Sequence, residues 1–509
     1  MPSRVSPALV LRAAAALLIG VLVLPAVPDV DLWGHTLFGG DILRTGGVPT
    51  SDPYSFTSDV PWINHEWASE LVMYASFALS GGPGLVALRA LLIALTLAIV
   101  VRAVRRDGAS IEAVFPMLAV LALVTYPRTQ HVRPQLFSLV AFAALLATLM
   151  RYDQTRSWRS LIPAPLVMLA WANFHGGFLV GLVPVGAWGL KVLFDRHLAL
   201  RQKAAAAAVL ACSAPLTLVN PYGVGLWQFL WSTVGLGRAD ISEWWSVAQS
   251  GAGVFLFWVV TAAVAVVVAV RSPERPAWHR VILVAGLGYA SFRVSRLDAF
   301  FAIVTVMTFG RSLGALLRSP AATPGAAWRP AAALSTAALL VAFAGASVAL
   351  LRASSNDGCR ELPSWLPDQR SAVFVAENRL EGKILVFFNW GEFVIWHFAP
   401  ALQVSTDGRR ETVYSDRHIQ GHLEVYKGSA AGTKYLRQLA PDYVWLPRTA
   451  AIIAQIEGQG WTRIFEGERS LILARHDLAV ARHFAQPAGN CFESANGRQS
   501  PIRRGLWSY

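Results

Sequence analysis

The chain has 509 residues, of which 54% are hydrophobic and only 15% are charged. This composition excludes an ordinary soluble protein, which needs more charge to solvate its surface. The net charge of +13 does not indicate nucleic-acid binding, because much of the excess lies in short loops between apolar segments, where it orients helix insertion.

Apolar segments long enough to cross a hydrocarbon core follow one another from Ala8 to about Leu351. The first begins with basic residues, as a signal peptide does, but no clean small-x-small cleavage site precedes Pro28, so we interpret it as a retained helix. The sequence predicts about eleven transmembrane helices, near residues 8–27, 84–104, 111–126, 134–150, 160–173, 177–194, 204–219, 252–270, 281–292, 298–313 and 330–351.

Alternate loops differ in basic residues, with 18 Lys and Arg on one side and 6 on the other. The first set is therefore predicted to be cytoplasmic, together with the N-terminus. An odd number of spans then places residues 352–509 outside, as a periplasmic or extracellular domain. Cys359 and Cys491 flank that domain. They either form a disulfide, which contributes roughly 4 kcal/mol in the chain-entropy model, or remain free thiols.

The first outer loop, residues 28–83, is long and acidic. Its segments 32–43 and 67–79 have the apolar spacing of helices that lie at a membrane surface. Asp29 and Asp31 follow the first span directly; such a pair binds a divalent cation, accepts a proton, or caps the next helix. The ionisable residues of the loop are Asp29, Asp31, His35, Asp41, Arg44, Asp52, Asp59, His65, Glu66 and Glu70.

The other outer loops are short but also hold ionisable side chains. They contribute His131, Arg133, His175, Glu243, Arg293 and Arg296. Arg89 lies within the second span, where an arginine marks a functional site or reaches to lipid headgroups. Simpler roles also fit: Arg133 sets the topology, and Arg293 and Arg296 pair with Asp298.

This layout resembles the GT-C glycosyltransferases, membrane enzymes that use polyprenyl-phosphate-linked sugars. The segments 29–35, 46–49 and 52–55 are similar to the first outer loop of that superfamily. The segment Phe387–Trp396, followed by Asp407, lies where oligosaccharyltransferases carry Trp-Trp-Asp-Tyr-Gly, but Asn389 replaces the Asp. The chain is also similar to bacterial predicted GT-C membrane proteins.

The resemblance implies sugar transfer from a polyprenyl-phosphate donor to a glycan, lipid or protein acceptor, at the outer face of a bacterial inner membrane. Asp31 would be the general base or a metal ligand, with Asp29 and Glu66 as further catalytic candidates. A Mg²⁺ or Mn²⁺ ion would bind Asp31 and Glu66. Donor and acceptor would contact His35, His65, Arg89, His131, Arg133, His175, Glu243, Arg293, Arg296, Trp390 and Asp407. The alternatives are a transporter or flippase of a lipid-linked substrate, and a non-catalytic scaffold with a binding ectodomain.

The C-terminal residues alternate strand-like and helix-like segments, which predicts a small α/β domain. We expect helices near 371–380, 416–430 and 450–458. The expected strands are 383–388, 403–406, 443–446, 463–465 and 471–474. The sequence thus predicts a polytopic α-helical membrane protein with a membrane domain, residues 1–351, and an extracytoplasmic α/β domain, residues 352–509.

Overall fold

The computed structural model describes residues 29–316, except 110, 237, 239–240 and 273–275, and residues 365–487. The predicted spans 8–27 and 330–351 lie outside the described residues, as do Cys359 and Cys491 of the predicted disulfide. The described chain divides into two compact units. The first, here the helical unit, contains residues 85–316; the second, here the sheet unit, combines residues 29–84 with 365–487.

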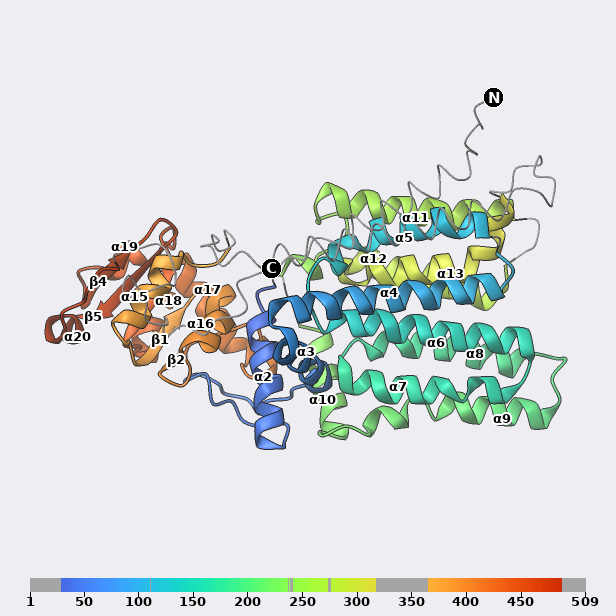
Figure 1. Ribbon diagram of the computed structural model, residues 1–509, viewed down its shortest axis with the longest axis horizontal. Coiled ribbons are helices and arrows are strands. Elements are labelled where there is room, and N and C mark those ends of the chain that lie inside the picture. Colours follow the sequence, from blue (N-terminus) through green and yellow to red (C-terminus); the bar gives the residue numbers. More distant parts are fainter. Residues whose placement is uncertain are drawn as a thin grey trace, which may run out of the picture. The chain divides into compact units, whose positions relative to one another are not determined.

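Helices that run alongside one another make up the helical unit (Figure 1). Its α-helices are α4 (Gly82–Arg106), α5 (Ile111–Thr129), α6 (Gln135–Thr155), α7 (Pro163–Phe174), α8 (Phe178–Phe194), α9 (Leu200–Ala211), α10 (Val224–Val234), α11 (Ala252–Arg271), α12 (Trp278–Arg293) and α13 (Asp298–Leu316). The 3-10 helices are η1 (Trp158–Leu161), η2 (Pro215–Leu218), η3 (Ser242–Trp244) and η4 (Ser295–Leu297). The predicted span 204–219 is interrupted where α9 ends at Ala211 and η2 begins at Pro215, which has no backbone N–H to donate to the carbonyl of Ala211.

Burial patterns fit a bundle surrounded by lipid. Helix α13 packs against α5, α6, α11 and α12, and every side chain from Asp298 to Gly310 is buried. Helix α11 instead exposes apolar side chains such as Phe255 and Val266, which suits contact with hydrocarbon. Among the described helices, α4, α6 and α11 are long and apolar enough to cross a membrane, and α8 is apolar but shorter. The protein is thus a helical membrane protein; the number and orientation of its spans stay predictions.

A five-stranded mixed sheet forms the core of the sheet unit (Figure 1). Its strands are β1 (Gly382–Val386), β2 (Leu402–Val404), β3 (Tyr443–Pro447), β4 (Trp461–Glu466) and β5 (Ser470–Arg475). The order is β2-β1-β3-β5-β4; β2, β1 and β3 are parallel, whereas β5 and β4 are antiparallel additions. All five strands lie within a few residues of their predicted positions.

Helices cover the sheet. They are α15 (Gln369–Glu377), η5 (Phe388–Trp390), α16 (Gly391–Phe398), η6 (Arg410–Thr412), α17 (Asp416–Lys427), α18 (Ala430–Leu439), α19 (Ile453–Ile456) and α20 (His476–Ala481). Successive side chains of strand β3 point to opposite faces of the sheet, and both faces are buried. Val444 and Leu446 join the core formed with α17, α18 and α19, whereas the Trp445 ring lies 6.4 Å from the Phe393 ring of α16.

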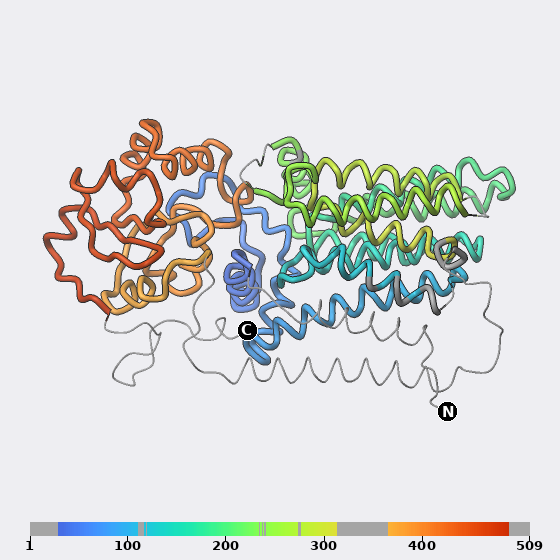
Figure 2. The backbone as a smooth tube through the Cα atoms, turned by 90° about the horizontal axis from the view of Figure 1, so that it is seen from above, coloured from blue at the N-terminus to red at the C-terminus, as the bar shows by residue number. Residues whose placement is uncertain are grey.

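The first outer loop is part of the sheet unit. Its helices, α2 (Leu32–Thr45) and α3 (Trp67–Ser80), pack on each other, and α2 also packs on α16. Between them, Ser55 pairs in parallel with Val404 of β2, so the loop extends the sheet edge. The sequence predicts this loop as a part of the membrane domain, whereas its described residues share a compact unit with residues 365–487 (Figure 2).

Candidate active site

Two aspartates, Asp29 and Asp31, precede α2, and the structure gives them different roles. Asp29 is buried, and its Oδ1 accepts a hydrogen bond of 3.0 Å from the backbone N–H of Asp31. That bond forms a local turn just before α2. Asp31 occupies the N-cap position of α2, but its side chain makes no capping hydrogen bond. Capping of α2 is therefore not the role of the Asp31 carboxylate.

The Asp31 carboxylate lies next to Glu392, which begins α16. A Cβ added to Gly408 would lie 1.9 Å from Asp31 Oδ1 and 3.0 Å from Glu392 Oε1. Both carboxylates therefore approach the same glycine, where only a residue without a side chain fits. The other oxygen of Glu392, Oε2, accepts a hydrogen bond of 3.0 Å from the N–H of Gly34 in the first turn of α2.

Burial and like charge affect the Glu392 carboxyl group. The side chain is 2% exposed. Burial, and then the neighbouring charges of Asp31 and Asp407, raise its pKa well above the usual range of a glutamate. Pairs of carboxylates whose environments push their pKa values apart are a common arrangement for general acid–base chemistry. Glu392 was part of the segment that carried the resemblance, but the sequence did not single it out.

Three further side chains of this unit could hold a metal ion. The potential ligand atoms of His35, Glu66 and Glu70 all lie within 4.8 Å of one another. His35 Nδ1 is 3.0 Å from Glu70 Oε1, and its Nε2 is 3.8 Å from Glu66 Oε2. Although burial lowers the pKa of His35, the hydrogen bond to Glu70 and the negative charges of Glu66 and Glu70 raise it to about 9. Without a metal, His35 is thus a cation between two carboxylates.

The donor set of this triplet fits a divalent ion. One imidazole nitrogen with carboxylate oxygens suits Zn²⁺ or Mn²⁺ better than Mg²⁺, which prefers oxygen ligands alone. The Nδ2 of Asn64 donates a hydrogen bond of 2.6 Å to Glu70 Oε2 and would fix that ligand. Of the predicted pair of metal ligands, Glu66 belongs to this triplet and Asp31 does not. His65 lies beside it, with Nε2 3.7 Å from Glu66 Oε1.

Asp407 belongs to a buried ionic network that joins the first loop to the sheet. Arg409 donates to Asp407 through Nε and Nη2, at 2.8 and 2.7 Å, and the hydroxyl of Tyr414 donates at 2.6 Å. The same guanidinium binds Asp52 of the first loop in a bidentate pair, at 2.7 and 2.9 Å. Its carbon Cζ also lies 4.7 Å from the ring centroid of Trp62. The predicted substrate residue Asp407 is thus held by structural partners, Arg409 and Tyr414.

Trp390, another predicted substrate residue, is buried in the sheet unit. Its Nε1 donates to the carbonyl of Trp365 at 2.9 Å, and its ring lies near those of Phe387 and Trp445. These contacts are those of a core residue.

Two of the predicted arginines, Arg133 and Arg296, lie with Arg128 near Glu243 in the helical unit. Arg133 Nη1 is 2.6 Å and Arg128 Nη1 is 3.4 Å from Glu243 Oε1. Arg128 also pairs with Asp298 at 3.2 Å, so Asp298 has a different partner from Arg293 and Arg296, the partners that the sequence suggested. Although burial raises it, the charges of Arg133 and Arg296 lower the pKa of Glu243 to about 2.

Arg293 and Arg296 differ in their surroundings. Arg293 is exposed and donates to the hydroxyl of Tyr289 at 3.3 Å. Arg296 lies with its Cζ 5.7 Å from the ring centroid of Trp244. Arg293 enters no ion pair with any described residue.

The remaining predicted residues of the helical unit have local roles. Arg89 is fully buried, and its Nε donates to the carbonyl of Thr129 at 2.5 Å, so it does not reach outward from its helix as a snorkelling arginine would. His175 Nδ1 accepts the N–H of Gly177 at 2.9 Å and lies 2.8 Å from the hydroxyl of Ser138. His131 lies between α5 and α6. These contacts hold turns and neighbouring helices together.

Comparison with solved structures extends over almost the whole chain. ArnT from Cupriavidus metallidurans aligns with 92% of this chain and 98% of its own, with a TM-score of 0.50 at 14% sequence identity. The chain therefore has a GT-C-like fold. The superfamily resemblance inferred from the sequence is thereby confirmed at the level of the fold.

Two further GT-C structures are similar. The mycobacterial arabinofuranosyltransferase AftD aligns with 94% of this chain at 14% identity and a TM-score of 0.49, and this chain spans 40% of the AftD chain. The Archaeoglobus fulgidus oligosaccharyltransferase, solved with Zn and sulfate, aligns with 86% of this chain and 68% of its own, at 13% identity and a TM-score of 0.47. No family model and no curated protein sequence matches the chain. Activity, substrates and partners are therefore matters for proposal.

The GT-C-like chain brings together some of the predicted site residues and separates others. Asp31, His35, His65 and Glu66 lie in the sheet unit near two carboxylates that the sequence did not single out, Glu70 and Glu392. Arg133 and Arg296 cluster with Arg128 around Glu243 in the helical unit, whereas Arg89 and Arg293 have other partners. A signal for Glu392 was present in the sequence, because it is the only charged residue in the apolar segment Phe387–Trp396.

Proposed function

We propose that this protein is a membrane glycosyltransferase that moves a sugar from a polyprenyl-phosphate donor to an acceptor at the outer face of the membrane. The observation that carries the proposal is the meeting of Asp31 and Glu392 at Gly408, inside a GT-C-like fold. Asp31 would act as the general base toward the acceptor hydroxyl. Glu392, whose pKa is raised, would hold a proton beside it and limit the negative charge.

A divalent ion at His35, Glu66 and Glu70 belongs to this proposal. When bound, such an ion would supply positive charge for the phosphate that leaves the donor. Glu70 is held by Asn64 and His35 by Glu70, so two of the three ligands are already oriented. Arg293 and Arg296 are the further candidates for phosphate, because a guanidinium forms paired hydrogen bonds to phosphate oxygens.

The direct test uses the full chain in liposomes with polyprenyl phosphates that carry radiolabelled monosaccharides. Cell-envelope extracts supply glycan, lipid and protein acceptors. The proposal predicts that label becomes covalently attached to one acceptor class, with release of polyprenyl phosphate. Label that crosses the bilayer while the donor remains intact would contradict transfer and support a transporter of lipid-linked sugars.

A substitution at Gly408 tests the contact between the two carboxylates without removing either. In Gly408→Ala, the new Cβ would overlap Asp31 Oδ1 and displace it, so turnover should fall on the order of 10- to 100-fold. Gly47→Ala is the matched control, since its Cβ enters open space and turnover should stay unchanged. Both are assayed by initial rates of label transfer. Equal rates for Gly408→Ala and wild type would exclude a catalytic role for this contact.

Metal binding has its own prediction. In His35→Ala, the affinity of the full chain for Mn²⁺ or Zn²⁺ should fall by at least about tenfold, because one of three ligands is lost. Isothermal titration calorimetry or Mn²⁺ EPR measures it. His65→Ala is the control: His65 lies beside Glu66 but outside the triplet, so its affinity should match wild type. If both variants bind equally well, the triplet holds no metal, and the His35–Glu70 pair only joins α2 to α3.

A further inference from the structure

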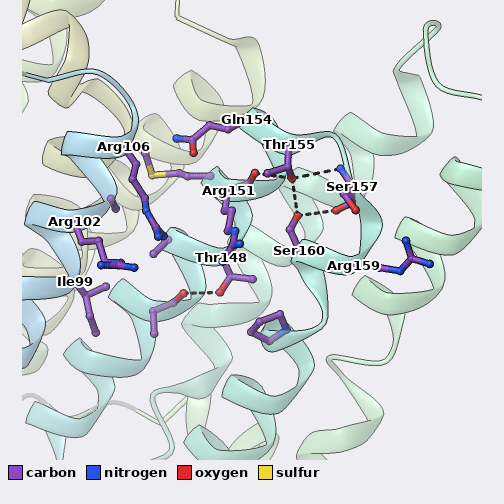
Figure 3. Close-up of a pocket in the computed structure, with 15 residues that line it drawn as sticks. Ile99, Arg102, Arg106, Thr148, Arg151, Gln154, Thr155, Ser157, Arg159 and Ser160 are labelled. Atoms are coloured by element: carbon purple, nitrogen blue, oxygen red, sulfur yellow. Dashed lines mark hydrogen bonds between the residues drawn. The ribbon is translucent and has the colours of Figure 1, made fainter.

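A cavity of about 490 Å³ opens in the helical unit between α4 and α6, where both helices end (Figure 3). None of its lining residues is among those proposed above for sugar transfer. Basic and hydroxyl side chains line it, including Arg102, Arg106, Thr148, Arg151 and Ser160. By the predicted orientation, this end of the helices faces the cytoplasm.

Three arginines of the cavity converge on it from two helices. Arg102 and Arg106 are four residues apart, so they lie on the same face of α4. Figure 3 shows their side chains extending toward α6, where Arg151 and Thr148 lie, whereas Arg159 points away from the others. Helix insertion depends on the number of basic residues in a loop and not on where their side chains point. It therefore does not explain why three arginines face the same cavity.

Within the described part of the chain, these arginines also lack counter-charges. No described carboxylate forms an ion pair with Arg102, Arg106 or Arg151, and no acidic residue lines the cavity. Other basic residues of the same unit do have partners: Arg280 pairs with Asp107 and Asp153 at 3.2 and 2.9 Å. Three guanidinium groups that face one cavity repel one another, and an anion bound there would remove the repulsion.

We propose that this cavity binds the phosphate headgroup of an anionic phospholipid from the surrounding membrane. Guanidinium groups match phosphate oxygens in geometry and charge. The same cavity has apolar lining from Ile99, Ala103, Ala147 and Pro163, which suits the first methylene groups of acyl chains. The helices that bound it, α4 and α6, are both long and apolar enough to cross a membrane. A basic pocket between such helices is a recurrent site for anionic headgroups.

The test uses the purified full chain in detergent and short-chain dioctanoyl phosphatidylglycerol as the probe, with binding measured by native mass spectrometry and microscale thermophoresis. The variant Arg102→Gln/Arg106→Gln/Arg151→Gln should lower the affinity on the order of 100-fold, since each basic residue contributes about fivefold near a charged lipid. Arg201→Gln is the control. Arg201 is an exposed arginine of α9, outside the cavity, and its loss should leave binding unchanged.

Competition experiments distinguish a lipid headgroup from free phosphate as the ligand of the cavity. Dioctanoyl phosphatidylcholine should not compete with phosphatidylglycerol, and inorganic phosphate should compete only at concentrations far above those of the lipid. If inorganic phosphate competes as well as the lipid, the site takes free phosphate and the lipid proposal is wrong. Equal affinities of the triple variant and wild type would also overturn it. Circular dichroism of the triple variant checks that its helices are intact, and single Arg151→Gln should retain a fivefold effect where the triple variant fails to fold.

Discussion

Replacing Arg409 by Met should destabilise the sheet unit by about 3–5 kcal/mol, because the change leaves two buried carboxylates without their counter-charge. Arg409 binds Asp407 and Asp52 through four hydrogen bonds of 2.7 to 2.9 Å. Methionine keeps the apolar volume of the stem, so the loss is mainly electrostatic. The shift in thermal unfolding, followed by tryptophan fluorescence of the full chain in detergent, measures the effect.

A surface pair supplies the matched control. Arg448 forms an ion pair of 2.7 Å with Glu466, but its side chain is 47% exposed. Arg448→Met should therefore cost at most about 1 kcal/mol. Hydrogen–deuterium exchange adds a local readout: residues 54–63 should exchange faster in Arg409→Met, because the loop has lost its ionic attachment. If both variants unfold like wild type, the network contributes nothing to the joining of the loop and the sheet.

The pH dependence of Arg409→Met has a definite sign. In the wild type, burial raises the pKa of Asp52 to about 6, even though the charge of Arg409 lowers it. Although burial raises the pKa of Asp407, the charge of Arg409 holds it below its usual value. Without Arg409, the pKa values of both buried carboxylates rise in the folded state, while in the unfolded chain they stay near 3.9. The folded variant then binds more protons than the unfolded chain, so its stability increases as the pH falls from 7 toward 5. The difference in the free energy of unfolding between Arg409→Met and wild type should therefore narrow between pH 7 and pH 5.

Local patterns in the sequence were sufficient for the strands of the sheet unit and for some of its helices. Alternation and β-branched residues located all five strands, and helical spacing located α2 and α3 of the first loop. Helix α16 was missed, because its segment Gly391–Phe398 is apolar almost all round and has no helical period. Helix α18 was missed although Ser429 caps it, with Oγ accepting the Gly432 N–H. The predicted helix 416–430 extended past Gly428, whose positive φ ends α17.

The meeting of distant segments was beyond those patterns. Gly34 and Glu392 are 358 residues apart in the chain, yet the N–H of one donates to the carboxylate of the other. Hydropathy assigned the first loop to the membrane part because it lies between two apolar segments. What joins the loop to the sheet is instead a set of specific contacts, such as the Asp52–Arg409 pair and the bridge between Ser55 and Val404. Such contacts leave no periodic signal in the sequence.

The same reasoning explains which site residues were predicted. Asp31 could be predicted from its position after the first span and from the family resemblance. The metal triplet needs α2 and α3 side by side, since His35 is on α2 and Glu70 is on α3. Sequence alone paired Glu66 with Asp31 as metal ligands and did not consider Glu70. Once the helices are packed, Glu70 lies 3.0 Å from His35.

Replacing Asp31 by Asn should lower turnover by about 10²- to 10⁴-fold, the usual contribution of a positioned general base. Asparagine has almost the same size but cannot accept a proton at neutral pH. Because the Asp31 side chain makes no capping hydrogen bond, the change should leave α2 intact. Initial rates with saturating donor, together with the unfolding temperature, separate a chemical loss from a structural one.

Asp29 and Glu392 make the Asp31 prediction specific. Asp29→Asn keeps the oxygen that accepts the Asp31 N–H, so turnover should stay within about threefold of wild type if Asp29 only forms the turn. Glu392→Gln keeps the acceptor for the Gly34 N–H and mimics a protonated carboxyl, the form that burial and the Asp31 charge favour. It should therefore lose far less activity than Asp31→Asn. If Asp29→Asn is the inactive variant and Asp31→Asn turns over normally, the base is Asp29. If Glu392→Gln is as inactive as Asp31→Asn, Glu392 itself must transfer a proton.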